Sequence, residues 1–337
     1  MKALFLHGPG RASLEDAPIP APGDDDLLVR TKAATICTSD LTDMASNPFD
    51  IPLPVIMGHE GAGFVEAVGR NVSGFTPGDA VAAHPVMPCG HCDPCSRGLG
   101  HLCDNMEHLG LTRGGVFAEY FTIRADRARH KPDAVSFAEA TLMEPICVCI
   151  EAIERACVKP GETVLVVGDG PFGVLIAKLC AAYNPAKIII SGHHPYRLSK
   201  AEGAVAVLDR GCTDDALADI IKANDGKNVD SAIVCVASAQ AVATGVAALR
   251  PRGTLSVFAA DKSPTPVDLF KIQIKELNIC GSCNDTGFLD KALELLQDRR
   301  INPGGLITHQ LPLPRWEEAF EIARNGKDSA LKVSFTL

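Results

Sequence analysis

Four cysteines follow one another at short intervals in "PCGHCDPCSRGLGHLC", residues 88–103. Their spacing is Cys-x2-Cys-x2-Cys-x7-Cys, and three glycines in the same stretch allow the backbone to wrap around an ion. Four thiolates fill the tetrahedral shell of Zn²⁺ and leave no position open for a substrate. We therefore predict a structural zinc lobe over about 88–104, whose ligands are Cys89, Cys92, Cys95 and Cys103.

Two alternatives remain for these thiols: reactive or disulfide-forming cysteines, and an iron–sulfur cluster. The chain has 337 residues and 13 cysteines, and its first residues resemble neither a signal peptide nor a membrane span. This usage favours a reducing compartment, where clustered thiols bind metals more often than they form disulfides. We expect a cytoplasmic protein without membrane spans, and we expect the adjacent His91 and His101 to lie on the surface.

A second set of potential ligands is dispersed along the chain. It consists of Cys37 in "ICTSD", His59 and Glu60 in "GHEGAG", and Glu144 in "MEPICV". Taken singly, such a cysteine is usually a core residue and such a Glu-Pro pair usually begins a helix. Taken together, they offer sulfur, nitrogen and oxygen ligands, which form the mixed shell that leaves zinc an open catalytic position.

The stretch "VVGDGPFG", residues 166–173, contains G-x-G-x-x-G directly after an apolar run and directly before an apolar helix. In this context the glycines allow a tight turn, a close approach to a pyrophosphate and close packing of helix on strand. The alternative is an ordinary strand-to-helix turn. We predict a dinucleotide site whose contacts come from Gly168, Gly170, Pro171, Phe172 and Gly173.

The residue expected to bind the adenosine ribose departs from the usual pattern. An acid is expected at the end of the second strand, but "IIISGHHPYRL" has Gly192 there. Without a carboxylate to bind the 2′-hydroxyl or repel a 2′-phosphate, and with Ser191, His193, His194 and Arg197 nearby, the sequence favours NADP over NAD. The alternative is a solvated loop, with NAD held by backbone contacts.

The elements that position these residues fall into two regions. Residues 1 to about 130 are rich in Pro and Gly and carry short β-branched runs, which indicate an irregular, mostly β domain. From about 160, six short apolar runs alternate with helix-length segments such as 171–183 and 238–249, which predicts an α/β, doubly wound parallel sheet. The tail from about 284 adds a helix and a strand that we expect to rejoin the first domain.

Charge limits the classes of partner. The net charge is -9, and no run of Lys or Arg occurs. A nucleic-acid partner would require a basic face, so a zinc module that binds nucleic acid is not expected. We expect a small-molecule ligand.

The order of "GHEGAGFVEAVG", "FTPGDAV", the four-cysteine lobe, "GGVFAEY", the Glu-Pro pair and "VVGDGPFG" resembles that of the zinc-dependent medium-chain dehydrogenases. The sorbitol and threonine dehydrogenase branch is the most similar, because it also has Glu at the positions of Glu60 and Glu144. The resemblance implies a GroES-like catalytic domain over 1–146 and 284–337 and a Rossmann domain over 147–283. It also implies a homo-oligomer, either a dimer or a tetramer.

The same resemblance implies an activity: hydride transfer between NAD(P) and a secondary alcohol of a polyol, sugar derivative or amino alcohol. Cys37, His59 and either Glu60 or Glu144 would bind a catalytic zinc, the second zinc of the chain. Ser39 matches the hydroxyl that hydrogen-bonds the alcohol, although it can equally be a turn serine. Many relatives have a histidine where this chain has Thr42, and a hydroxyl cannot hold a proton near neutral pH.

A catalytically silent nucleotide-binding regulatory protein on the same scaffold is the main alternative, but the intact set of zinc ligands argues against it. Five further residues are candidates to line the substrate pocket: Phe49, Met57, Glu107, Arg113 and Phe117. Arg113 would suit an anionic or polyhydroxylated substrate, or it would brace the loop before "FAEY".

Overall fold

The computed structural model describes residues 1–209, 214–259, 262–326 and 329–337. Contacts within the chain divide these residues into two compact units. Unit 1 contains residues 1–145, 286–326 and 332–337, and unit 2 contains the described residues of 146–285 and 327–331. Among the described residues, no helix is both long and apolar enough to cross a membrane.

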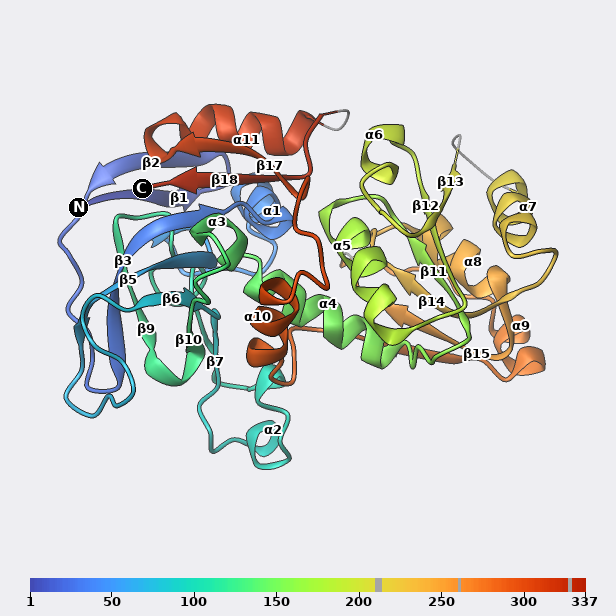
Figure 1. Cartoon of the computed structure of the whole chain (residues 1–337), viewed down its shortest axis with the longest axis horizontal. Coiled ribbons are helices and arrows are strands. Elements are labelled where there is room, and N and C mark those ends of the chain that lie inside the picture. The colour runs from blue at the N-terminus through green and yellow to red at the C-terminus, as the bar shows by residue number, and fades with distance from the viewer. Residues whose placement is uncertain (210–213, 260–261, 327–328) are drawn as a thin grey trace. The chain divides into compact units, whose positions relative to one another are not determined.

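Unit 1 is built mainly of β-strands (Figure 1). Its largest sheet contains β3 (Asp26–Thr35), β5 (Glu60–Val68), β6 (Ala80–Ala83), β9 (Tyr120–Arg124), β10 (Ala128–His130), β17 (Ile307–Pro312) and β18 (Lys332–Thr336). The strands follow the order β10-β6-β5-β3-β18-β17, and β9 also pairs with β3. Two smaller sheets, of order β2-β1-β4 and β7-β8, consist of β1 (Lys2–Gly8), β2 (Arg11–Asp16), β4 (Val55–Ile56), β7 (Val86–Met87) and β8 (Glu107–His108).

The helices of unit 1 are short. They are α1 (Thr38–Ser46), α2 (Asp93–Ser96), α3 (Phe137–Ala140), α10 (Leu289–Gln297) and α11 (Trp316–Asn325). The helix α4 (Met143–Arg155) begins in unit 1 and continues into unit 2.

The C-terminal strand β18 lies inside the main sheet of unit 1. It pairs antiparallel with β3, where Phe335 faces Ala34, and parallel with β17. The Phe335 side chain is fully buried and packs edge-on against Phe117, with ring centroids 5.0 Å apart. Burial of one such ring contributes about 1.5–3 kcal/mol. Residues from the two ends of the chain therefore share one core.

Unit 2 has a six-stranded parallel sheet among its described residues. Its strands are β11 (Thr163–Val167), β12 (Lys187–Gly192), β13 (Val205–Leu208), β14 (Val229–Val234), β15 (Leu249–Val257) and β16 (Asn278–Gly281). The order β13-β12-β11-β14-β15-β16 is the 3-2-1-4-5-6 order of a dinucleotide-binding fold. The predicted α/β doubly wound sheet is confirmed.

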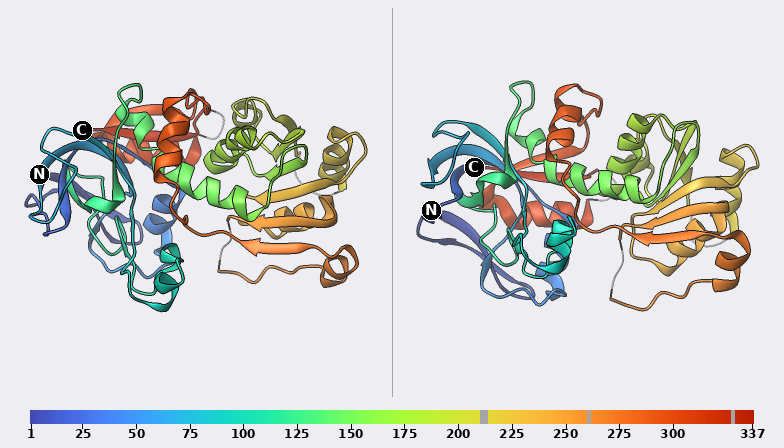
Figure 2. Two further views of the ribbon diagram at one scale, coloured as in Figure 1. Left: turned by 60° about the horizontal axis from the view of Figure 1, so that its bottom comes forward. Right: turned by 90° about the horizontal axis from the view of Figure 1, so that it is seen from below.

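Helices connect the strands of unit 2, as the two views of Figure 2 show. They are α5 (Pro171–Cys180), α6 (Pro195–Leu198), α7 (Asp214–Ala223), α8 (Ala239–Ala248) and α9 (Leu269–Lys275). The helix predicted over 171–183 ends as an α-helix at Cys180 and continues as one 3-10 turn to Tyr183. Asn184 follows with φ 51°, a left-handed conformation that ends the helical path.

Candidate metal and cofactor sites

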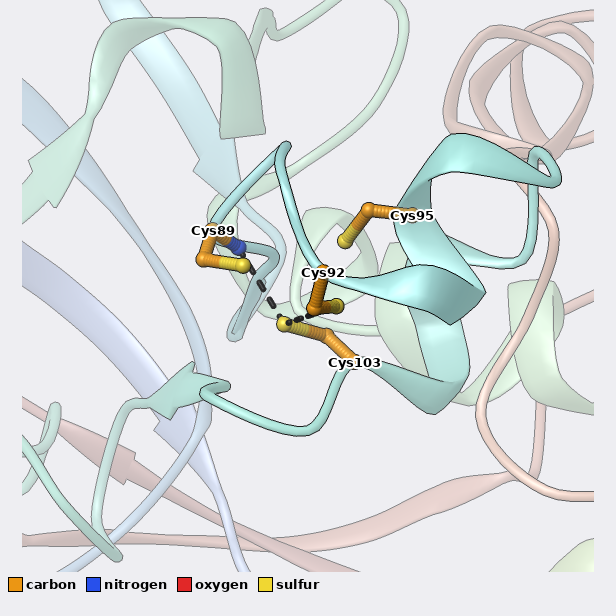
Figure 3. Close-up of side chains that lie close together, drawn as sticks. All are labelled: Cys89, Cys92, Cys95 and Cys103. Carbon is orange, nitrogen blue, oxygen red and sulfur yellow. Dashed lines mark hydrogen bonds between the residues drawn. The ribbon is translucent and has the colours of Figure 1, made fainter.

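The four cysteines of the zinc lobe converge in unit 1 (Figure 3). Their four sulfur atoms all lie within 4.8 Å of one another. Cys92 Sγ and Cys103 Sγ are 3.7 Å apart, whereas a disulfide requires about 2 Å. In a tetrahedral zinc site with Zn–S bonds of about 2.3 Å, neighbouring sulfurs are about 3.8 Å apart. The arrangement therefore fits a zinc ion.

Backbone N–H groups point at the sulfurs of this lobe. The amides of Cys89 and Asn105 donate to Cys103 Sγ at 3.2 and 3.3 Å. A hydrogen bond from the backbone at His91 lowers the pKa of the Cys89 thiol to about 6. This donor favours the thiolate of Cys89, the form that binds metal, whereas burial raises the pKa of the Cys95 thiol to about 12. His91 is exposed as expected, but the surface position predicted for His101 is wrong, because the turn Gly100–Leu102 buries its ring.

The dispersed ligands Cys37, His59 and Glu60 come together in the same unit. One ligand atom from each lies within 4.8 Å of the other two, and all three residues are buried. The antiparallel pairing of β3 with β5 explains this, because it sets Thr35 opposite Glu60. Cys37 follows β3 by two residues and His59 directly precedes β5, so the pairing brings their side chains together.

Asp40 positions two of these ligands. Its Oδ2 accepts a hydrogen bond from the Cys37 backbone N–H at 2.8 Å, which closes a capping box at the start of α1. Its Oδ1 lies 3.5 Å from His59 Nδ1. A carboxylate on one ring nitrogen orients a histidine and leaves the other nitrogen for a metal. Sequence analysis missed Asp40, although the three-residue spacing from Cys37 is a capping signal.

Glu60 forms a buried ion pair with Lys332 from the C-terminal strand. Lys332 Nζ lies 2.7 Å from Glu60 Oε1, and the two side chains are 3% and 0% exposed. The other oxygen, Glu60 Oε2, is buried and has no hydrogen-bond partner among the described residues. A buried carboxylate oxygen without a partner is costly unless a cation binds it. This atom therefore fits the role of a metal ligand.

The groups around Cys37, His59 and Glu60 stabilise a positively charged group at this point. Burial alone would lower the pKa of His59, but the Asp40 carboxylate and the Cys37 thiol raise it well above its usual value. Burial also raises the pKa of Glu60 against the opposing effect of Lys332. A divalent cation at this point would satisfy the carboxylates and the thiolate together.

Glu144, Ser39 and Thr42 occupy different positions around this cluster. Glu144 is buried at the start of α4, outside the group of three, and its charge contributes to the raised pKa of Lys332. Ser39 lies half-buried in the first turn of α1. Thr42 is exposed, and its hydroxyl donates to the carbonyl of Thr38 at 3.1 Å.

The glycine motif of unit 2 adopts the turn that the sequence predicts between β11 and α5. Gly168 has φ 118° and donates its N–H to the Ser191 carbonyl at 2.8 Å. A Cβ on Gly173 would lie 1.9 Å from the Gly168 carbonyl oxygen, so helix and strand pack too closely for any side chain there. Gly170 caps α5, and Pro171 begins it. The motif thus presents the N-terminus of α5 as an anion site.

A carboxylate that sequence analysis did not expect lies beside the end of β12. An ideal Cβ on Gly192 would lie 2.4 Å from Asp169 Cβ and 2.6 Å from Asp169 Oδ2. The side chain of Asp169, the second residue of the glycine motif, therefore fills the space beside Gly192. Its Oδ2 accepts from the His194 backbone N–H at 2.5 Å and lies 3.1 Å from His194 Nδ1. β12 itself ends at Gly192 without an acid, as the sequence indicates, and the carboxylate beside it comes from Asp169.

The other residues predicted to contact the cofactor here differ in exposure. Ser191 is buried in β12. His193 is exposed, and its Nδ1 lies 2.8 Å from the Asp209 carbonyl oxygen. Arg197 is buried, and its Nε donates to the Ala330 carbonyl at 3.1 Å. Phe172, in the first turn of α5, packs against Phe258 with ring centroids 5.0 Å apart.

Comparisons with known proteins agree with this geometry. The sequence model of the alcohol dehydrogenase GroES-like domain matches residues 23–133, and that of the zinc-binding dehydrogenases matches 171–298. A sorbitol dehydrogenase from Bacillus subtilis is 31% identical over 99% of this chain and 96% of its own length. The chain belongs to the zinc-dependent medium-chain dehydrogenases. Within them it falls in the sorbitol dehydrogenase-like branch, so the predicted family and the expected oxidoreductase activity are confirmed.

Two solved structures of similar fold contain cofactors. A dehydrogenase from Escherichia coli complexed with NADH is 28% identical, with a TM-score of 0.92 over 100% of this chain and 99% of the other. A zinc-binding dehydrogenase from Sinorhizobium meliloti bound to NADP is 27% identical, with the same TM-score and coverage. The two neighbours bind different nicotinamide cofactors, so they do not distinguish NAD from NADP for this chain.

The five residues suggested for the substrate pocket divide between core and surface. Met57 and Phe117 are buried in the core of unit 1, whereas Phe49 and Glu107 are exposed. Arg113 bonds to Asp26 Oδ2 at 2.5 Å and to Thr122 Oγ1 at 2.7 Å, and so joins β3 to β9. In the dehydrogenase the bracing alternative for Arg113 is the better supported.

Proposed function

We propose that this dehydrogenase oxidises a secondary alcohol of a polyol and passes the hydride to NAD(P)⁺. The observation that carries the proposal is the buried group of Cys37, His59 and Glu60, with Glu60 Oε2 lacking a partner among the described residues. The polyol class is supported by the sorbitol dehydrogenase relative. The reaction is balanced: the alcohol loses a hydride and a proton and becomes a ketone, and the cofactor gains the hydride.

In this proposal Cys37 and His59 hold a catalytic zinc together with Glu60 or Glu144. When bound, zinc supplies a Lewis acid that lowers the pKa of an alcohol hydroxyl towards neutrality. Asp40 keeps the His59 ring in place through Nδ1, and Lys332 holds Glu60 through Oε1. Ser39 Oγ accepts the hydroxyl proton while its own hydroxyl proton passes on towards solvent. Because Thr42 cannot store that proton, the next acceptor is water.

The second zinc of the proposal is structural and lies in the lobe of Cys89, Cys92, Cys95 and Cys103. Support comes from the sulfur spacing of a tetrahedral shell and from the N–H donors on Cys103 Sγ. The described cysteines are free thiols, which is in keeping with the reducing, cytoplasmic environment that we propose for the protein.

We also propose that the dehydrogenase is a homo-oligomer, a dimer or tetramer, and that residues 147–283 form its dinucleotide-binding domain. In unit 2, β16 is an edge strand of the described sheet. The neighbouring helix α9 exposes Leu269, Phe270 and Ile274, which are 76%, 70% and 61% exposed. An apolar face next to an open strand edge is typical of a surface that another subunit covers.

A screen of polyols, sugar alcohols and amino alcohols, with NAD⁺ and with NADP⁺, tests the proposed activity. We expect oxidation of one or more polyols, and loss of that activity in Cys37→Ser, in protein that keeps its fold and cofactor binding. Activity confined to primary alcohols would contradict the polyol assignment. Full activity of Cys37→Ser would contradict the proposed zinc site. The same screen tests the NADP preference favoured by the residues around Gly192.

A further inference from the structure

Beside Gly192, at the end of β12 in unit 2, lies a carboxylate in an unexpected position, because it follows β11 rather than β12. In dinucleotide-binding folds, an acid at the end of the second strand binds the adenosine ribose. That strand is β12, which ends at Gly192. The parallel pairing of β11 with β12 sets Val167 beside Ser191, so the residues that follow the two strands are neighbours. Asp169 follows β11 and reaches across to Gly192.

The space beside Gly192 admits only one side chain. An ideal Cβ at Gly192 would lie 2.4 Å from Asp169 Cβ and 2.5 Å from Asp169 Cγ, separations that real atoms do not adopt. Asp169 therefore requires glycine at position 192, and an acid at 192 would require a smaller residue at 169. Only one of the two positions can therefore carry an acidic side chain. In this chain that position is 169, which follows the neighbouring strand β11.

The Asp169 carboxylate is held firmly. Its side chain is 8% exposed, and it accepts from the His194 backbone N–H at 2.5 Å. His194 Nδ1 lies 3.1 Å from the same oxygen. A carboxylate fixed in this way lies beside the end of β12, where a ribose hydroxyl would donate to it and a 2′-phosphate would be repelled.

The basic residues that favoured NADP have other partners. Arg197 is buried and donates to the Ala330 carbonyl, His194 faces Asp169, and His193 lies against the Asp209 backbone. Among these side chains, the one nearest Gly192 is the carboxylate of Asp169.

We propose that Asp169 replaces the missing acid of β12 as the residue that recognises the ribose, so that the enzyme prefers NAD(H) to NADP(H). The proposal rests on the proposed nicotinamide cofactor and names the side chain that selects it. The missing acid at Gly192, considered alone, suggests a preference for NADP(H), whereas this proposal predicts a preference for NAD(H). One titration with both reduced cofactors distinguishes the two preferences.

The test measures dissociation constants of NADH and NADPH by fluorescence titration of the full chain. We expect wild-type protein to bind NADH at least about tenfold more tightly than NADPH, the effect of one charge-assisted hydrogen bond. Asp169→Asn should weaken NADH and strengthen NADPH, reducing the ratio by about tenfold to a hundredfold. Asp225→Asn is the matched control, because Asp225 is an exposed carboxylate that precedes the amino end of β14, whereas Asp169 follows the carboxyl end of β11.

A double variant moves the acid to its usual place. Asp169→Gly removes both the Cβ and the carboxylate that block Gly192, and Gly192→Asp added to it should restore a preference for NADH. Calorimetric binding of AMP, compared with that of adenosine 2′,5′-bisphosphate, reports on the 2′-position of the ribose without the zinc site or turnover. Both readouts remain informative if Asp169→Asn folds poorly.

The possible outcomes separate this proposal from the proposed function. Tighter binding of NADPH by the wild type, or a ratio unchanged in Asp169→Asn, would overturn the role of Asp169 and leave the dehydrogenase assignment intact. Failure of folded wild-type protein to bind either nucleotide would overturn both.

Discussion

At the scale of single residues, the candidate catalytic cluster depends on side chains that bind and on side chains that hold them. Cys37, His59 and Glu60 supply the ligand atoms. Asp40 and Lys332 hold two of them, through contacts of 3.5 Å to His59 and 2.7 Å to Glu60. Each of these roles leads to a different measurable effect when the residue is changed.

Replacing a ligand should remove one metal and keep the other. We expect Cys37→Ser to lower the zinc content from two ions per chain to one and to reduce turnover by at least about a hundredfold, because the Lewis acid is lost. Elemental analysis of fully loaded protein measures the metal. Cys180→Ser, a change at a buried cysteine in α5, should keep both ions. Two zinc ions in Cys37→Ser would exclude Cys37 as a ligand.

Replacing the residue that orients His59 should weaken metal binding without abolishing it. We expect Asp40→Asn to reduce affinity for the catalytic zinc by about tenfold to a hundredfold, the usual effect of losing a carboxylate behind a histidine ligand. Competition with a chromogenic chelator measures this affinity. Thr42→Ala, on the exposed side of the same helix, is the control. Equal chelator competition in the two variants would contradict the role of Asp40.

At the scale of elements, the strand-turn-helix β11–α5 has two glycines with separable roles. A Cβ at Gly173 would meet the Gly168 carbonyl oxygen at 1.9 Å, whereas a Cβ at Gly170 has nothing within 4 Å. Gly170 also has φ -65°, which any residue adopts. Packing of α5 on β11 therefore requires a glycine at position 173. The glycine at position 170 instead leaves room for a ligand to approach the backbone closely.

Alanine substitutions distinguish these roles. Gly173→Ala should destabilise the protein by about 1–3 kcal/mol, since overpacking must move the helix from the strand. Gly170→Ala should keep wild-type stability and weaken dinucleotide binding, because its methyl group lies at the N-terminus of α5. Chemical denaturation and NADH titration measure the two effects. Loss of stability in Gly170→Ala, or its absence in Gly173→Ala, would contradict this assignment.

At the scale of the whole molecule, the exposed apolar face of α9 bears on assembly. Phe270→Glu should weaken self-association, because it places a charge within the proposed contact between subunits. Light scattering coupled to gel filtration measures the mass across a dilution series. Ile19→Glu, at an exposed apolar residue of unit 1, is the control. A monomeric wild type at micromolar concentration, or unchanged association of Phe270→Glu, would exclude this interface.

Sequence alone determined the parts of the molecule whose interactions are local. The four cysteines lie within one short loop, so their spacing already predicts a closed metal shell. The six apolar runs and the glycine motif likewise predict a parallel sheet with a dinucleotide turn, because buried parallel strands read as continuous apolar segments.

Only the tertiary structure decided the contacts between distant segments. Lys332 reaches Glu60 across 272 positions because β18 enters the sheet beside β3. Asp169 fills the space at Gly192 because parallel pairing brings the ends of β11 and β12 together. The order of residues along the chain shows that the strand ending at Gly192 lacks an acid. It does not record that the neighbouring strand supplies one, because pairing between strands, and not spacing along the chain, determines that contact.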